Sequence, residues 1–418
     1  MAEKQNTPEI RFEGFTDPWE QRKLGEVASI KTGPFGSLLH AEDYVVDGIP
    51  IVTTEHFKSG FLPDEIAGLP QVSESDRARL EQYSAIEGDI LFSRVGSVDV
   101  NAQVTAAQSG WLFSGRVLRA RPTVSVISPN YLHYELSTDD VKRSIINRAV
   151  GGTMASINTE ILEDTEISFP RSRTEQLEIG RSLGNLDSLI ALHQRKYDKL
   201  CTVKKSMLDK MFPKLGETEP EIRFEGFTDP WEQRKLGELC TFSKGHGYSK
   251  ADIRDAGTPL ILYGRLYTQY ESRIEEVDTF TVEQDGSILS RGNEVIVPAS
   301  GETAEDIAIA SSVRRSGIIL GGDLNVVTPT GKLDPDYTAL AITYSKAHDD
   351  LAKRAQGKSV VHVHGNDIAE VEISYPSESE QKRISSVVLN LDSLITLHQR
   401  KLELLRNIKK SLLDRMFV

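Results

Sequence analysis

Two segments of the chain carry apolar residues in alternating steps of four and three positions, which is the spacing of a coiled coil. The first lies within residues 172–212 and runs from Ile179 to Met211, and the second lies within residues 377–418. This alternation places a narrow apolar stripe along one side of a helix. Each segment therefore predicts a long helix that packs along a second helix.

The predicted helices have clear ends. Ser172 and Ser377 each precede a glutamate by three positions, which is the capping-box pattern at a helix N-terminus. No proline interrupts the first segment before Pro213, where the helix must stop. A helix from Thr174 to Met211 would span roughly 57 Å at 1.5 Å per residue. The domains between the segments do not need such long helices, so we expect the two helices to pack on each other, antiparallel.

The predicted seam mixes apolar and polar residues. It contains Ile179, Leu183, Leu186, Ile190, His193 and Tyr197 in the first helix, and Ile384, Val388, Leu391, Ile395, His398 and Leu402 in the second. Two interpretations of the histidines remain open: they set the helix register, or they act as ligands or pH-sensitive groups. Lys204 and Lys409 lie farther along the same stripe, and we expect their side chains to extend into solvent. Gly180 should weaken the start of the first helix by up to about 1 kcal/mol relative to alanine.

An internal duplication surrounds these helices. The nineteen residues from Pro8 to Glu26 recur without change from Pro220 to Glu238. Within the helices, NLDSLI and LHQRK recur at an offset of 205 residues, whereas the stretches in between share little. A repeated frame therefore encloses two diverged inserts. This arrangement fits a protein that presents two different binding surfaces, and it does not fit a solenoid of short repeats.

Both inserts show the pattern of short strands, with apolar runs separated by turn residues. The expected strands are 48–53, 88–96 and 165–170 in the first insert, and 258–265, 293–301 and 371–376 in the second. Helical patterns lie near 131–150 and 337–356. Each insert is therefore predicted to be a mixed α/β domain. The whole chain is predicted to be an α+β protein with internal pseudo-two-fold symmetry.

These patterns divide the sequence into six predicted segments. They are an N-terminal frame segment at 1–26, a first domain at 27–170, a central helix at 171–212, a linker with the repeated frame at 213–238, a second domain at 239–376 and a C-terminal helix at 377–418.

Composition narrows the class of protein. The 418 residues contain two cysteines, Cys201 and Cys240, so no cysteine-based zinc site is expected, and a reducing cytoplasm is the expected compartment. There is no apolar run long enough for a membrane span and no apolar leader at the N-terminus. The formal net charge of −13 argues by itself against a nucleic-acid partner, although a basic face can coexist with acidic surface elsewhere.

Signatures of catalysis are missing from the sequence. None of the 17 prolines follows another, so the Asp/Asn-Pro-Pro-aromatic motif of amino-methylating enzymes is absent. Lys358 and Ser359 follow a glycine as in a phosphate-binding loop, but position 352 holds alanine where that motif needs glycine. His362 and His364 would share one face of a strand, without a third metal ligand nearby. We therefore predict a non-catalytic chain without a metal site, and a stand-alone methyltransferase is disfavoured.

The repeated parts resemble a known family. The frame FEGFTDPWEQRKLGE is followed by a variable insert that ends in a strand and a proline, and then by NLDSLI, LHQRK and MF. This order resembles the specificity subunits of type I restriction–modification systems, over the whole chain and in both copies. The runs GDILFSRVG and VPASGETAEDIA also look like segments of that family's recognition domains.

The resemblance implies a function and a set of partners. It implies two target-recognition domains, each reading one half of a bipartite site on double-stranded DNA, with the helices holding the halves at a fixed separation. It also implies two modification subunits, which bind S-adenosylmethionine and methylate adenine, and two motor-nuclease subunits, which use ATP and Mg²⁺. This chain would carry no cofactor of its own. A coiled-coil adaptor that bridges partners without reading DNA is the alternative interpretation.

Candidate DNA-contacting residues are polar or basic side chains in expected loops, because such groups read base edges and bind phosphates. In the first insert they are Lys31, Thr32, Ser37, Ser93, Arg94, Arg148, Thr153 and Asn158. In the second they are Lys244, His246, Tyr248, Arg265, Tyr267, Lys353, Arg354, Gln356, Lys358 and Ser359.

Equivalent aromatic residues in the repeated frame have two open interpretations. Trp19 and Trp231, with Phe15 and Phe227, either dock the modification subunits or belong to the core. Two identical partners need two identical sites, so the frame is the expected docking surface.

Overall fold

The computed structural model describes residues 7–34, 38–57, 60–151, 154–214 and 216–418. The chain forms two compact units. Unit 1 contains Met1–Leu192 and Lys401–Val418, and unit 2 contains His193–Arg400. Each unit therefore combines one insert with a part of each long helix.

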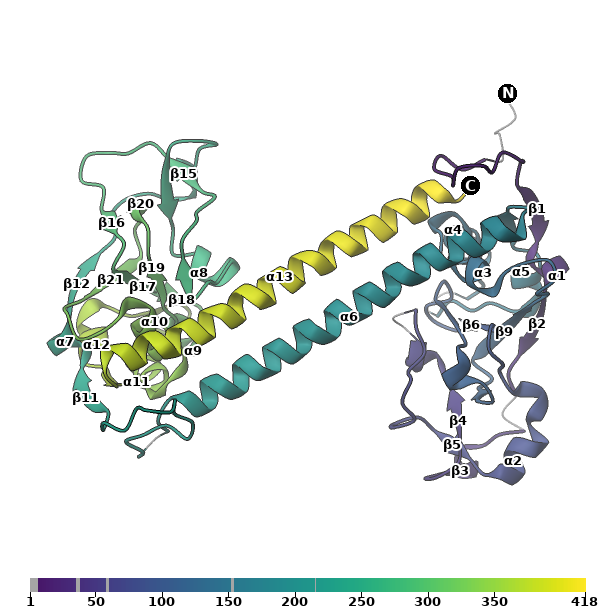
Figure 1. Ribbon diagram of the computed structural model, residues 1–418, viewed down its shortest axis with the longest axis horizontal. Helices are drawn as coiled ribbons and strands as arrows, with labels where there is room; N and C mark the ends of the chain where they lie inside the picture. Colours follow the sequence, from purple (N-terminus) through teal and green to yellow (C-terminus); the bar gives the residue numbers. More distant parts are fainter. Residues whose placement is uncertain (1–6, 35–37, 58–59, 152–153, 215) are drawn as a thin grey trace. The chain divides into compact units, whose positions relative to one another are not determined.

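The described part of unit 1 is a mixed α/β structure (Figure 1). One sheet has the order β2 (Ala28–Thr32), β9 (Val117–Pro122), β6 (Ile90–Ser93), β7 (Asn101–Gln103). A second sheet has the order β3 (Tyr44–Val45), β5 (Gln71–Val72), β4 (Ile49–Val52), β8 (Leu112–Phe113). A separate ribbon pairs β1 (Glu20–Lys23) with β10 (Glu166–Phe169). The short helices are α1 (Leu24–Val27), α2 (Glu74–Arg79), α3 (Pro129–Glu135), α4 (Asp139–Arg148) and α5 (Thr159–Glu163).

Unit 2 repeats this plan. Its larger sheet has the order β12 (Cys240–Lys244), β21 (Leu324–Pro329), β17 (Glu294–Pro298), β19 (Ser311–Val313), β14 (Arg273–Ile274). A second sheet has the order β15 (Phe280–Thr281), β13 (Thr258–Ile261), β20 (Ser316–Leu320), β16 (Leu289–Arg291). Two ribbons pair β11 (Glu232–Lys235) with β23 (Glu372–Tyr375), and β18 (Ser300–Gly301) with β22 (Val361–His362). The short helices are α7 (Leu236–Leu239), α8 (Arg265–Thr268), α9 (Ala304–Ile307), α10 (Pro335–Tyr344), α11 (Lys346–Arg354) and α12 (Gly365–Ala369).

The β2–β9–β6–β7 sheet, which we call the central sheet of unit 1, lies between two hydrophobic cores. Side chains alternate along a strand, so Ile90 and Phe92 of β6 enter one core while Leu91 enters the other. The first core also contains Tyr131 of α3, whose buried hydroxyl donates to the Ser168 carbonyl at 2.7 Å. Unit 2 makes the equivalent bond between Tyr337 and the Ser374 carbonyl, also at 2.7 Å.

Several element boundaries differ from the sequence-based expectation. The helical pattern at 131–150 is two helices, because the hydroxyls of Ser137 and Thr138 donate to carbonyls of the last turn of α3 and end it. The pattern at 337–356 likewise forms α10 and α11. The expected strand at 258–265 ends at Ile261, and the one at 293–301 divides into β17 and β18.

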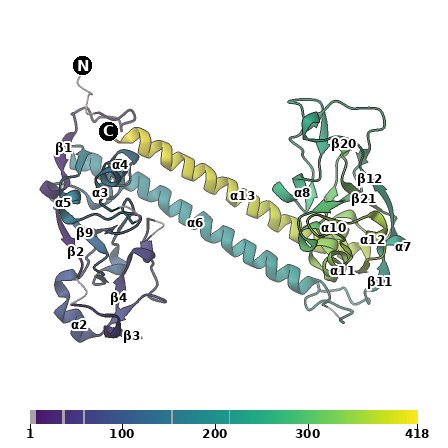
Figure 2. The ribbon, with the colours of Figure 1, turned by 180° about the vertical axis from the view of Figure 1, so that it is seen from behind.

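The two long helices, α6 (Arg173–Met211) and α13 (Glu378–Met416), each have 39 residues. Parts of both lie side by side in each unit (Figures 1 and 2). In unit 2, His193 contacts His398 and Lys204 contacts Asp392, so a step forward along α6 is a step backward along α13. The helices are antiparallel, as predicted. The predicted seam residues are all buried or half-buried.

The histidine pair lies where equivalent residues of the two helices meet. The Nδ1 atoms of His193 and His398 are 2.7 Å apart, so one ring donates and the other accepts. If both rings carried a proton on Nδ1, neither nitrogen could accept, and this hydrogen bond could not form. The contact fits the predicted role of a register-setting polar pair.

The seam lysines form ion pairs instead of extending into solvent as expected. In unit 2, Lys204 Nζ lies 2.5 Å from Asp392 Oδ1, and in unit 1, Lys409 Nζ lies 2.6 Å from Asp187 Oδ1. Both aspartates belong to the repeated NLDSLI run. Each aspartate also accepts a hydrogen bond from a hydroxyl of the domain in its own unit. The Tyr134 hydroxyl donates to Asp187 at 2.7 Å, and the Ser272 hydroxyl donates to Asp392 at 2.9 Å. A single carboxylate therefore joins a domain to both helices in each unit.

The start of α6 is continuous through Gly180, and the expected weakening of the helix by this glycine stays a prediction. A Cβ added at Gly180 would lie 2.9 Å from the Asn130 Cβ and 3.1 Å from the Tyr131 backbone nitrogen. Glycine is needed here because α3 approaches the helix backbone closely.

The capping glutamates have a partner that the sequence reading missed. The Ser172 hydroxyl accepts from the Glu175 backbone N–H at 3.4 Å, as a cap should. The Glu175 carboxylate, however, is fully buried and binds Arg11 in a bidentate pair, with distances of 2.6 and 2.9 Å. Arg223 and Glu380 make the same pair in unit 2, at 2.8 and 2.9 Å. These pairs attach the repeated frame segment to the first turn of each long helix.

The frame tryptophans belong to the core. Trp19 is 4% exposed and packs edge-on against Tyr131, and Trp231 is 7% exposed and packs against Tyr337 in the same way. A docking role for these two tryptophans is therefore wrong. Phe15 and Phe227 are half-buried.

Candidate nucleic-acid interface

Each unit carries a surface loop of the same backbone design directly after a helix. After α4 in unit 1, Val150 and Ser156 exchange two backbone hydrogen bonds, at 2.9 and 2.8 Å. After α11 in unit 2, Gln356 and His362 exchange the same two bonds, at 3.0 and 2.8 Å. We call these the unit 1 loop (150–156) and the unit 2 loop (356–362).

Glycine at the second position makes both turns possible. Gly151 has φ 108° and Gly357 has φ 135°, a region that side-chain-bearing residues rarely adopt. A Cβ at Gly357 would meet the Val360 carbonyl oxygen at 2.0 Å, and one at Gly151 would meet that of Met154 at 2.5 Å. Met154 and Val360 occupy equivalent places and are 64% and 50% exposed. In their described residues the two loops therefore share a glycine turn and a closing pair of backbone hydrogen bonds, and they present different side chains.

The unit 2 loop gathers several of the predicted DNA-contacting residues. The Tyr267 hydroxyl donates to the Ser300 carbonyl at 2.8 Å, and the Ser300 hydroxyl lies 3.1 Å from His362 Nδ1. Gln356, Lys358 and Ser359 are exposed on the same loop. Tyr267, from a distant part of the sequence, thus lies beside it.

The unit 1 loop has Arg94 and Asn158 at its base. The Arg94 carbonyl accepts from the Ile157 backbone N–H at 2.9 Å, and the Arg94 guanidinium donates to the Gly115 carbonyl at 3.1 Å. Asn158 caps α5 by accepting from the Ile161 N–H at 2.9 Å. These contacts hold the loop, and they occupy the Asn158 side-chain oxygen.

A model of the type I restriction modification DNA specificity domain matches residues 16–201 and 228–407. The chain belongs to this family. It is 24% identical over 95% of its length to a putative type I restriction enzyme MjaX specificity subunit of Methanocaldococcus jannaschii, covering 92% of that protein. It is 20% identical to the MjaVIII specificity subunit of the same organism, over 98% of this chain and 95% of that one.

A solved structure supports the fold of this specificity subunit. The crystal structure of a type I restriction–modification S subunit from M. genitalium covers 99% of both chains at 15% identity, with a TM-score of 0.63. The predicted α+β architecture of two mixed domains and two long helices is confirmed.

Other predicted contact residues of the specificity subunit have structural partners. Ser93 is buried at the end of β6, and its hydroxyl donates to the Val95 carbonyl. Arg148 donates to Thr165 Oγ1 at 2.8 Å and to the Asp164 carbonyl at 3.0 Å, which fixes the end of α4. Arg265 pairs with Glu271 and Asp278. Their predicted DNA contacts stay predictions, and each would have to break or share these bonds.

The remaining predicted residues are spread over both units. Thr32 is half-buried at the end of β2. Lys244, the last residue of β12, and His246, which follows the strand, are exposed, whereas the Tyr248 hydroxyl contacts the Ser287 hydroxyl at 2.5 Å. Arg354 pairs with Asp350, and Lys353 is exposed beside it. Ser37 and Thr153 lie outside the described residues.

Two titratable side chains of α3, His133 and Glu135, are buried inside unit 1. Burial lowers the pKa of His133 to about 3, and its Nδ1 lies 2.8 Å from the Asn101 side-chain oxygen. Burial raises the pKa of Glu135 to about 8, and its carboxyl accepts from the Ser168 N–H at 2.7 Å. Both side chains are closed off from solvent, so neither is placed to bind DNA.

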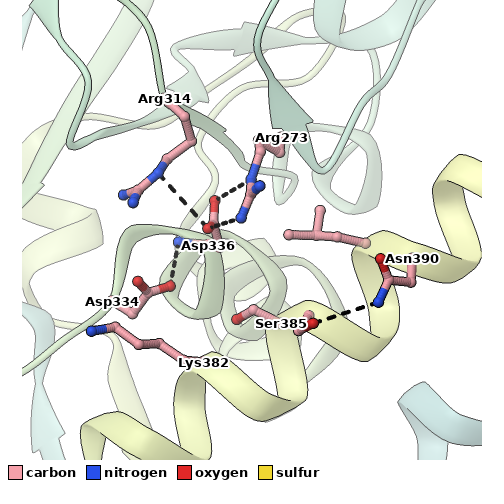
Figure 3. Close-up of a pocket in the computed structure, with 9 residues that line it drawn as sticks. Arg273, Arg314, Asp334, Asp336, Lys382, Ser385 and Asn390 are labelled. Carbon is pink, nitrogen blue, oxygen red and sulfur yellow. Dashed lines mark hydrogen bonds and ion pairs between the residues drawn. The ribbon is translucent and has the colours of Figure 1, made fainter.

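A small cavity of about 260 Å³ lies between the second domain and α13 (Figure 3). Its buried carboxylate, Asp336, pairs with Arg273 and lies 3.8 Å from Arg314. Lys382, Ser385 and Asn390 of α13 line the other side. Three cations, Arg273, Arg314 and Lys382, line this cavity together with two carboxylates, those of Asp334 and Asp336.

The described residues contain neither a metal-binding cluster nor a membrane-spanning helix. Within the described ranges, no group of three or more histidine, cysteine or acidic side chains is arranged to hold a metal ion. His362 lies in β22 and His364 precedes α12, so the two are not on one strand face as expected. In the same ranges, no helix has the length and apolarity to cross a membrane.

Proposed function

We propose that each unit of this specificity subunit reads one half of a bipartite site on duplex DNA. The observation that carries the proposal is the pair of equivalent loops, whose described residues share a glycine turn and a closing pair of hydrogen bonds and differ in side chains. Family membership supports sequence-specific DNA recognition by the chain. The duplication supports two half-sites, because a repeated frame with diverged domains offers two readers on one support.

We further propose that the helices set the spacing between the half-sites. Both α6 and α13 continue without interruption from one unit into the other. A helix of this length spans about 58 Å at 1.5 Å per residue. Half-sites read from one face of the duplex lie about 34 Å apart or at multiples of that distance, which a rigid helical spacer can enforce.

We also propose that α6 and α13 carry the docking surfaces for two modification subunits. In unit 1, Leu189 and Leu192 of α6 are 43% and 40% exposed. Their equivalents in unit 2, Leu394 and Leu397 of α13, are 44% and 45% exposed. Exposed leucines at identical places of a duplicated sequence fit two copies of one apolar partner surface.

The heptad positions place further apolar residues on the same flank. In an antiparallel pair the g positions of the two helices face each other and form one flank of the pair. In unit 1 this flank carries four apolar residues at g or c positions: Leu189, Leu192, Leu404 and Ile408. The last two are 59% and 38% exposed. Asp187, which binds the domain through Tyr134, occupies an e position on the opposite flank. The apolar flank is thus the one that the domain leaves uncovered.

Replacing Leu394 and Leu397 together with serine is expected to remove one modification subunit from the complex. The exposed side chains contribute little to the fold, so the chain should remain folded. Mass measurement of the purified complex should show one modification subunit where the unchanged chain binds two. The matched control replaces Thr396 and Gln399, exposed at b and e positions on the opposite flank of α13, with alanine. Retention of two subunits by the leucine variant would show that docking occurs elsewhere.

The proposed role is non-catalytic, in line with the specificity family. S-adenosylmethionine would be bound by the modification subunits, and ATP and Mg²⁺ by the motor-nuclease subunits. This chain would supply the sequence information that directs both activities.

Methylome sequencing tests the proposed function. Cells that contain this chain and its modification subunit should carry N6-methyladenine in a motif of two short half-sites separated by unspecified bases. A contiguous motif, or no added methylation from a folded complex, would contradict the proposal.

A further inference from the structure

Three basic side chains share one face of the central sheet in unit 1. Lys31 of β2 lies directly opposite Arg119 of β9, and Arg121 follows two residues later on the same face. Among the described residues, Asp89 supplies the single carboxylate that forms ion pairs with this group, and its partners are Arg119 and Arg121. This group therefore carries an excess of positive charge within a chain whose net charge is −13.

The Asp89 carboxylate forms both of its short ion-pair contacts with Arg121. Asp89 is 1% exposed and binds Arg121 in a bidentate pair at 2.7 and 2.8 Å. Arg119 is 6% exposed, its Nε lies 3.9 Å from Asp89, and that Nε has no hydrogen-bond partner in the described structure. A buried guanidinium without full pairing is costly, and a bound anion nearby would offset that cost.

Lys31 presents this charge to the surface. Its Nζ donates to the Gln82 side-chain oxygen at 2.9 Å and lies 5.0 Å from the Tyr83 ring centre. Because the oxygen of the exposed Gln82 amide accepts this bond, the NH₂ group of the same amide remains available as a donor. Burial, together with Arg119 and Arg121, lowers the pKa of Lys31, as expected for an ammonium among like charges.

We propose that Lys31, Gln82 and Arg121 form a subsite for a phosphate group of the DNA backbone. The inference rests on the proposed DNA-binding function and adds where unit 1 holds the strand. Lys31 and Arg121 are both partly exposed and supply charge, while Gln82 supplies a neutral donor. In unit 2 the positions equivalent to Lys31, Arg119 and Arg121 hold Ser243, Val326 and Thr328, so the subsite belongs to unit 1 alone.

The salt dependence of binding tests the subsite. The probe is a random-sequence duplex of about 30 base pairs, bound by the complex of the full chain with its modification subunits over a series of NaCl concentrations. Lys31→Gln should make the slope of log Kobs against log[NaCl] less steep by about 0.9, the value for one phosphate contact. Lys31→Arg should keep the slope of the unchanged chain.

Arg143→Gln is the matched control, since it removes one positive charge from an exposed surface pair of unit 1. Its slope should equal that of the unchanged chain. If Lys31→Gln binds DNA with the original slope, or if Arg143→Gln lowers the slope equally, the subsite is overturned while DNA binding stands. If the unchanged complex binds neither this duplex nor one that carries the motif found by methylome sequencing, the proposed function itself fails.

Discussion

Replacement of Glu380 with glutamine should lower the free energy of unfolding of unit 2 by about 3–5 kcal/mol. Glu380 is 1% exposed and forms both of its ion-pair contacts with Arg223. The variant keeps the side-chain shape and leaves the Arg223 guanidinium, which is 14% exposed, with its longer contact to the exposed Glu219 at 3.7 Å in place of the buried bidentate pair. The frame segment should then detach from the start of α13. Hydrogen exchange of residues 220–235, measured by mass spectrometry, gives this opening free energy.

Glu378→Gln is the matched control, two residues earlier on the same helix. Glu378 pairs with the exposed Lys382, and an exposed pair of this kind contributes about 0–1 kcal/mol. Its exchange rates should stay close to those of the unchanged chain. Equal exchange in the two variants would show that the buried pair does not hold the frame.

Insertion of one heptad after His193 and one after His398 should change the spacer of the DNA motif. Insertions beside the histidine pair leave Asp187 opposite Lys409 and Lys204 opposite Asp392. Each helix gains about 10 Å, which corresponds to about three base pairs of duplex. Methylome sequencing should report a spacer that is longer by about that amount, or no methylation if the DNA cannot twist to present both half-sites.

The control is the same heptad inserted in α6 alone. It shifts the helices by one heptad on one side of the insertion and separates one of the two aspartate–lysine pairs, so methylation should be lost. An unchanged spacer in the double insertion would contradict the role of the helices as the spacing element.

The architecture was predictable because its signals are periodic and repeated. Seam positions recur every three or four residues over each helix, and the identical frame segments show that two similar units must form. The domain cores follow from short apolar runs such as the one that forms β6. Predictions that rest on many residues at once tolerate errors at individual positions.

The contacts of single side chains were not predictable in the same way. Glu175 matches a capping box, yet its carboxylate binds Arg11, which is 164 residues away in the sequence. The seam lysines looked like snorkelling side chains until their aspartate partners on the other helix were visible. The repetition of both motifs in the two copies was the available signal: a pair that recurs at a constant offset is a candidate contact.

The candidate DNA-contacting residues show a similar division. The sequence singled out Lys358 and Ser359 in the unit 2 loop, but not its backbone equivalence with the unit 1 loop, because the two loops share little besides a glycine. Arg119 and Arg121 escaped notice because they lie in an apolar strand, where only the sheet register places them beside Lys31.

Exchange of residues 27–170 for the corresponding domain of another specificity subunit tests the central claim most directly. The repeated frame and both helices remain unchanged, so the complex should assemble and methylate adenine. The account predicts a methylome in which one half-site has changed while the other half-site and the spacer length are retained. A motif that is unchanged, or one in which both half-sites change together, would contradict a chain that reads DNA with two independent units.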